Sequence, residues 1–330
     1  MINYEKNSKE RLKIEKTLIL IFSIFLIFIF LIFLLIVTTT RDELEPKFPA
    51  YRFVKYTNHT NYSKELVPHF KGLFDGVIVR LKLTDVKINS DGFRDREYTF
   101  KKNESTFRII VIGDSITFGI GVNLNETYPK QLERLLKIYY KNKNFEVLNF
   151  GVPGFNGRDA INFFLDKGLK YRPDMVIQTI SCSDFEDSME ERKLASEFEC
   201  HNCSFDEIKS NSIKVWEKLR DNMNQNMDYY FNLSLYQPIK RLSLMKEKEG
   251  FKYVIVYFRC KYLLPKEDFY VYKIKELNID EFIDSESLFE CIEYDSLITH
   301  PLDGHLNEKG NYLFARLIFT NLRPLIESII

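Results

Sequence analysis

Ser115 and His305 are the two residues best suited to covalent chemistry. Ser115 ends a Gly-Asp-Ser turn that follows the apolar run 107–112. A serine hydroxyl is a weak nucleophile unless an adjacent base, usually a histidine held by a third group, takes its proton. Of the five histidines, His59 and His69 lie in a polar N-terminal region and His201 lies between two cysteines, which leaves His300 and His305. Of these two, only His305 has a carboxylate two residues upstream, Asp303, and a helical pattern directly downstream. The sequence therefore predicts a site made of Ser115, His305 and Asp303, with His300 as the alternative base.

Three sequence blocks, in the same order along the chain, resemble the SGNH (GDSL-like) hydrolase family. They are Gly-Asp-Ser at 113–115, Asn-Phe-Gly-Val-Pro-Gly at 149–154 and Asp-Gly-His at 303–305. Upstream, Asn-Ser-Asp-Gly-Phe-Arg at 89–94 is similar to a lead-in of membrane-linked members, and the resemblance covers about 86–321. It implies a three-layer α/β/α sandwich around a parallel sheet of about five strands. It also implies ester hydrolysis by a serine nucleophile.

The resemblance implies an oxyanion hole as well, built from Ser115, Gly151 and Ser183. The first two would donate backbone N–H groups. Ser183 stands where the family carries an asparagine, followed here as there by an aspartate, Asp184. A serine hydroxyl can donate a hydrogen bond but has a shorter reach, and losing one oxyanion donor typically costs ~10²–10³ in rate. A catalytically weakened module that binds glycans or serves assembly is therefore the alternative.

The expected substrate is an acyl ester, above all an O-acetyl ester, on an envelope glycan or lipid. An O-acyltransferase would use the same site, with an alcohol in place of water. The chain has 47 basic and 47 acidic residues, and this zero formal charge argues against nucleic acid as a partner. We expect no cofactor and no metal, because Cys200 and Cys203 have no second pair at zinc-finger spacing. A disulfide within this loop, or between Cys260 and Cys291, is expected if the domain lies outside the cytoplasm.

Residues 18–37 predict a membrane anchor. They carry no charge, Ser23 is their only polar residue, and a helix of this length spans ~30 Å, the thickness of a bilayer core. A cleavable signal peptide is the alternative, but no small-x-small cleavage site follows. Five basic residues precede the segment and four follow by Lys55, which favours a cytoplasmic N-terminus and an extracytoplasmic catalytic domain.

Apolar runs alternate with amphipathic patterns from Phe107 onward, as in a parallel sheet covered by helices on both faces. The predicted organisation is a cytoplasmic tail (1–16), an anchor (17–38), a lead-in that packs on the catalytic domain (39–106) and the hydrolase-like domain (107–330) with an insertion at about 184–250. Strands are expected from 107 and at 145–149, 175–180, 253–258 and 279–283, and helices at 129–139, 159–170, 213–227 and 307–322.

Overall fold

The computed structural model describes residues 27, 29, 30, 32, 52–57, 59, 61–76, 79–181, 184, 227–259, 267–290, 292–301 and 303–330. The chain divides into two compact units, 1–47 and 48–330. In the first unit, residues 27, 29, 30 and 32 are helical and exposed. None of the helices that the structure describes is long and apolar enough to span a bilayer. The rest of the predicted anchor, and the predicted helix at 213–227 except for its last residue, lie outside the described residues.

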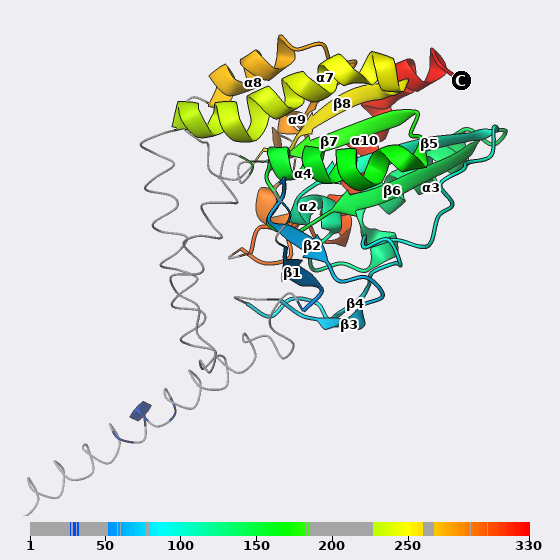
Figure 1. The fold of residues 1–330 in the computed structure, drawn as a ribbon. Coiled ribbons are helices and arrows are strands. Elements are labelled where there is room, and N and C mark those ends of the chain that lie inside the picture. Colours follow the sequence, from blue (N-terminus) through cyan, green and yellow to red (C-terminus); the bar gives the residue numbers. More distant parts are fainter. Residues whose placement is uncertain are drawn as a thin grey trace, which may run out of the picture. The chain divides into compact units, whose positions relative to one another are not determined.

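A five-stranded sheet forms the centre of the second unit, with the strand order β6-β5-β7-β8-β9 (Figure 1). Every pair of neighbouring strands is parallel. The α/β class and the parallel sheet of about five strands are thus confirmed. The strands are β5 (Thr106–Gly113), β6 (Asn144–Gly151), β7 (Met175–Ile180), β8 (Lys252–Tyr257) and β9 (Glu281–Asp284).

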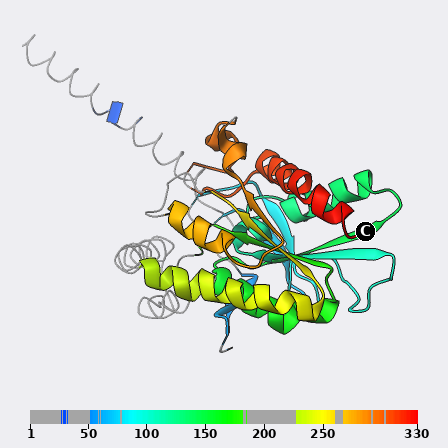
Figure 2. The same cartoon turned by 90° about the horizontal axis from the view of Figure 1, so that it is seen from above.

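Helices cover both faces of this sheet (Figure 2). Alternate residues of β5 point to opposite faces, so Ile109 and Val111 enter one apolar cluster while Ile110 and Ile112 enter the other. The first face carries α3 (Tyr128–Tyr139), α9 (Glu286–Glu290) and α10 (Glu308–Glu327), and the second carries α4 (Gly157–Phe163), α7 (Gln237–Glu249) and α8 (Glu267–Lys275). Three layers result, helix on sheet on helix.

Two helices differ from their predicted bounds. The last helix was expected to end before Pro324, yet α10 continues to Glu327. Both Leu322 and Ile326 are fully buried, and this burial outweighs the cost of a proline in the final turn. The helix expected at 159–170 is α4 followed by a π-helical turn (Phe164–Gly168) and a 3₁₀ turn (Leu169–Tyr171). The remaining short turns are α2 (Ser115–Phe118), η1 (Leu124–Glu126), η5 (Asn232–Tyr236) and η6 (Tyr294–Ser296).

The lead-in forms two small antiparallel ribbons that are separate from the central sheet. One pairs β1 (Val54–Tyr56) with β2 (Lys64–Leu66), and the other pairs β3 (Lys71–Phe74) with β4 (Thr84–Lys87). Just before β1, the ring of Phe53 stacks on the ring of Phe118 with 5.0 Å between centroids. The lead-in therefore packs directly against the segment that begins with Ser115.

Candidate active site

Ser115 is the first residue of α2 and follows the carboxyl end of β5. Asp114 caps this helix, because its Oδ1 accepts the N–H of Ile116 at 2.9 Å. Its Oδ2 accepts the hydroxyl of Ser181, beyond the end of β7, at 3.0 Å. Asp114 is buried and thus braces the turn that presents the serine. Open α/β sheets place ligands at this carboxyl edge.

The structure brings Ser115, His305 and Asp303 together. The Nε2 atom of His305 lies 2.8 Å from Ser115 Oγ, and its Nδ1 lies 2.6 Å from Asp303 Oδ1. A carboxylate only accepts, so Nδ1 carries the proton and Nε2 offers a lone pair to the Ser115 hydroxyl. Thr299 donates its hydroxyl to the same Asp303 oxygen at 2.9 Å. The hydroxyl of Ser115 bonds to His305, not to the alternative base, His300.

The electrostatics of the pair favour a charged imidazolium. Burial by itself would lower the pKa of His305, but the adjacent Asp303 carboxylate outweighs burial and raises that pKa above its usual 6.5. In the same way, burial would raise the pKa of Asp303, yet His305 and the hydroxyl of Thr299 lower it. A proton that leaves Ser115 is therefore well accommodated on His305.

The structure does not support Gly151 as the glycine that donates to an oxyanion. Its N–H donates to Asn149 Oδ1 at 3.0 Å. Gly151 instead permits close packing, since a Cβ there would lie 2.2 Å from the backbone nitrogen of Phe118. Three residues further, Gly154 has φ +75° and, among the described residues, its N–H makes no hydrogen bond. Block 149–154 contains both glycines, and the sequence pattern does not choose between them.

Several predicted residues lie outside the described residues. They are Ser183 of the oxyanion hole and all five cysteines, Cys182, Cys200, Cys203, Cys260 and Cys291. The described neighbour of Ser183, Asp184, accepts the N–H of Ser181 at 2.6 Å. Asp184 thus closes a local turn with the residue three positions before it.

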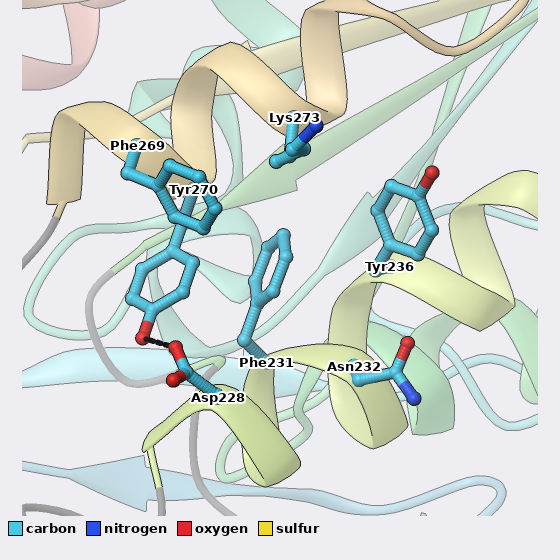
Figure 3. Close-up of a pocket in the computed structure, with 7 residues that line it drawn as sticks. All are labelled: Asp228, Phe231, Asn232, Tyr236, Phe269, Tyr270 and Lys273. Carbon is cyan, nitrogen blue, oxygen red and sulfur yellow. Dashed lines mark hydrogen bonds between the residues drawn. The ribbon is translucent and has the colours of Figure 1, made fainter.

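A hollow of about 720 Å³ lies beside the insertion (Figure 3). Four of its seven lining residues precede α7, within the predicted insertion, and three come from α8. The hydroxyl of Tyr270 donates to Asp228 at 2.6 Å on one side of it. Since α8 follows β8, its first turns lie toward the carboxyl edge of the sheet, where Ser115 also lies. The lining residues are Asp228, Phe231, Asn232, Tyr236, Phe269, Tyr270 and Lys273.

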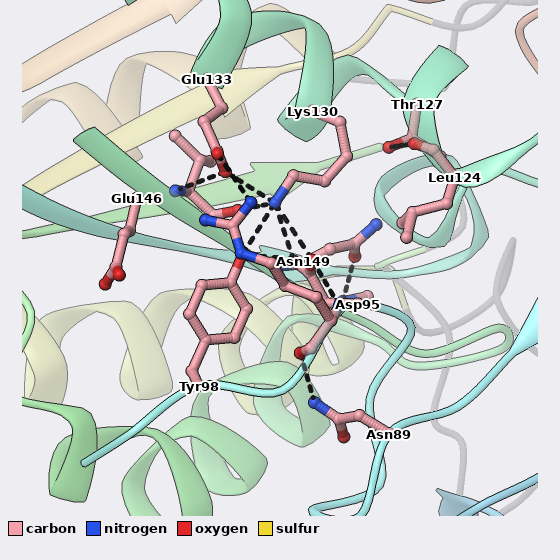
Figure 4. Close-up of polar contacts among 12 residues, drawn as sticks. Asn89, Asp95, Tyr98, Leu124, Thr127, Lys130, Glu133, Glu146 and Asn149 are labelled. Carbon is pink, nitrogen blue, oxygen red and sulfur yellow. Dashed lines mark hydrogen bonds and ion pairs between the residues drawn. The ribbon is translucent and has the colours of Figure 1, made fainter. Parts of the chain in front are cut away.

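Edge strand β6 is covered by a buried ionic cluster (Figure 4). Asp95 Oδ2 accepts the N–H of Asn149 at 3.0 Å, and Glu133 Oε2 accepts the N–H of Val147 at 3.1 Å. Between the two carboxylates, Lys130 Nζ lies 3.0 Å from Asp95 and 2.7 Å from Glu133. Edge strands leave a row of unpaired backbone groups, and this cluster satisfies some of them. It also holds Asn149, the residue that fixes the Gly151 amide.

Comparison with known proteins finds likeness in structure and none in sequence. No protein-family model matches the chain, and no curated protein matches its sequence. A lipolytic protein of the G-D-S-L family from Desulfitobacterium hafniense is 17% identical, with a TM-score of 0.42, covering 65% of this chain and 99% of its own. A mutant acetyl-xylooligosaccharide esterase from Geobacillus is 16% identical (TM-score 0.45; 66% and 94% covered), and a lipase from a goat rumen metagenome is 14% identical (0.44; 65% and 97%). At such values, a function has to be derived from the side chains of this chain.

Proposed function

We propose that this chain is a serine ester hydrolase of the SGNH type. The observation that carries the proposal is the continuous contact from Ser115 Oγ to His305 Nε2 at 2.8 Å and from His305 Nδ1 to Asp303 at 2.6 Å. Nucleophile, base and orienting carboxylate within hydrogen-bond reach of one another are the geometric signature of covalent acyl transfer. Of the three residues, only the serine follows a strand of the sheet, β5; the other two come from the loop before α10.

In the first half-reaction, Ser115 Oγ attacks the ester carbonyl carbon while its proton passes to His305 Nε2. Asp303 stabilises the imidazolium that forms, in line with the raised pKa of His305. The tetrahedral oxyanion would accept hydrogen bonds from the backbone N–H groups of Ser115 and Gly154. His305 then returns the proton to the departing alcohol oxygen as the carbon–oxygen bond breaks, which leaves an acyl group on Ser115.

In the second half-reaction, water takes the place of the alcohol. His305 removes a proton from the water, which attacks the acyl carbon, and then gives a proton to Ser115 Oγ as the acid leaves. Were the alcohol of a glycan or lipid to attack in place of water, the same steps would transfer the acyl group. A hydroxylated acceptor added to the assay separates these outcomes, because a transferase forms a new ester and a hydrolase forms free acid.

We propose an acyl ester on a glycan or lipid, above all an O-acetyl ester, as the substrate class. The hollow that the insertion and α8 line supports a glycan, since three of its lining residues, Phe231, Tyr236 and Phe269, are aromatic and aromatic rings pack against sugar rings. We also propose that 18–37 anchors the chain with the catalytic unit outside the cytoplasm. Protease added to intact cells that express the chain should then digest residues 48–330. Protection of this unit until the cells are opened would contradict that orientation.

The test of the central proposal is p-nitrophenyl acetate turnover by the full-length chain in detergent, beside Ser115→Ala. We expect turnover that disappears in this variant. Ser234→Ala is the matched control, because Ser234 is fully buried and makes no contact with the triad. Equal rates in wild type and Ser115→Ala would refute the proposal.

A further inference from the structure

Arg94 of the lead-in is a buried cation that is surrounded by backbone carbonyls. One guanidinium nitrogen donates to the carbonyl oxygens of Gly119 at 2.7 Å and Phe118 at 3.1 Å. The other donates to that of Val122 at 2.8 Å. Only 1% of Arg94 is exposed, and no carboxylate in the described part of the chain forms an ion pair with it. Burial lowers the pKa of Arg94 to about 10, so it remains charged at neutral pH.

A buried cation without a paired anion is costly unless hydrogen bonds satisfy it. Two of the acceptors, the carbonyls of Phe118 and Gly119, lie at the end of α2 and have no partner inside a helix of four residues, whereas that of Val122 lies further along the loop. The first residue of that helix is Ser115, whose carbonyl accepts the N–H of Gly119 at 3.0 Å. The guanidinium also lies over the Phe118 ring, 4.8 Å from its centroid. Arg94 thus fixes the end of the helix that presents the nucleophile.

The same loop packs against the acid–base pair. Gly121 adopts φ +79°, and a Cβ there would lie 2.5 Å from Thr299 Cγ2. Thr299 donates its hydroxyl to Asp303 at 2.9 Å and its N–H to the His305 carbonyl at 2.7 Å. Only glycine allows this backbone conformation and this close approach together. One loop, 118–122, therefore contacts the helix of the nucleophile on one side and the support of the base on the other.

We propose that Arg94 is a positioning residue of the hydrolytic site, which sets the separation of Ser115 from His305 by holding loop 118–122. This inference rests on the proposed function. It makes the lead-in part of the active site as well as a connection to the anchor. A misplacement of about 1 Å in reacting groups can cost ~10²-fold in rate, which sets the scale of the expected effect.

The experiment compares Arg94→Lys with Arg108→Lys in the full-length chain. Arg108 is the control, since it is equally buried and also donates to a backbone carbonyl, that of Tyr171 at 2.8 Å, but it pairs in addition with Glu146 and lies near the amino end of β5. Lysine keeps the charge in both variants and loses the planar fork of donors. The readouts are the rate at which a fluorophosphonate labels Ser115, kcat and KM for p-nitrophenyl acetate, the pH profile of both, and thermal unfolding.

For Arg94→Lys we expect labelling and kcat to fall ~10²-fold with KM little changed. The acid limb of the pH profile should move to lower pH. If Asp303 lies less closely against His305, it raises the pKa of His305 less, while burial still lowers that pKa. Arg108→Lys should lower thermal stability and leave rates and pH profile unchanged. A folded Arg94→Lys chain with wild-type labelling rate and pH profile would overturn the role of Arg94 alone. A wild-type chain that neither labels at Ser115 nor turns over ester would overturn both proposals.

Discussion

Replacing Asp303 by Asn is the sharpest test of how His305 is set up. The carboxylate lies 2.6 Å from Nδ1 and is largely buried, so water cannot readily take its place. An amide can donate to Nδ1, which would put the ring proton on Nε2, where it faces Ser115 and prevents proton transfer. In serine hydrolases this change lowers kcat ~10⁴-fold. We expect a loss of ~10³–10⁴-fold here, or about 4–5.5 kcal/mol of transition-state stabilisation.

The pH dependence of kcat/KM is a second, independent test of the roles of His305 and Asp303. The base must be neutral to accept a proton, and Asp303 raises the pKa of His305, so the acid limb of wild-type kcat/KM should lie above pH 6.5. In Asp303→Asn burial still lowers the pKa of His305 and only the smaller attraction of Asp114 still raises it, so the limb should move to lower pH. Stopped-flow turnover of p-nitrophenyl acetate from pH 5 to 9 measures both effects. Asp280→Asn, which removes a largely buried carboxylate paired with Lys246, is the control. A loss below tenfold, or a limb that stays in place, would refute the assigned roles.

Three further predictions concern the surroundings of the triad. Burial would raise the pKa of Glu133, but Lys130 and its other cationic neighbours lower it to about 2, so Glu133→Gln should cost about 3 kcal/mol in urea unfolding at pH 7. That difference should be complete above pH 4.5 and shrink as the pH falls toward 2. Gly151→Ala places a Cβ against the Phe118 backbone and should cost about 1–3 kcal/mol, read as a lower Tm together with lower kcat. Tyr236→Ala should raise KM for an acetylated oligosaccharide and leave p-nitrophenyl acetate kinetics unchanged; a parallel change in both would exclude the hollow as a glycan site.

The sequence predicts best where a short pattern has a single physical solution. The uncharged run 175–180, apolar except for Gln178 and Thr179, favours a strand buried on both faces of a parallel sheet, and β7 has these bounds. The Gly-Asp-Ser turn and the Asp-Gly-His block each bring their polar groups together locally, so Ser115 and His305 could be chosen before their 2.8 Å contact was known.

The sequence predicted less well those features that depend on packing between residues far apart in the chain. The choice between Gly151 and Gly154 depends on which amide is already bonded, here to Asn149. The continuation of α10 past Pro324 depends on a buried site for Ile326, which periodicity alone does not reveal. Arg94 belongs to the 89–94 block, and the sequence assigned it no role. Its carbonyl partners at 118–122 are about 25 residues away in the chain, and only the fold brings them near.

Two consecutive residues of the lead-in join these observations. Arg94 donates to the loop that follows the helix of Ser115, whereas Asp95 accepts the N–H of Asn149 at 3.0 Å, on the strand that leads to Gly154. Residues 92–95 form a bend, and from it the two side chains reach different partners, so one dipeptide contacts both the loop after the Ser115 helix and strand β6. In the proposed mechanism these ends carry the nucleophile and the second oxyanion amide. A lead-in that served only as a tether would need neither contact. Burying the charges of Arg94 and Asp95 costs desolvation free energy, which a mere tether would not require. Hence a chain shortened to 107–330 should lose turnover even where its central sheet still forms.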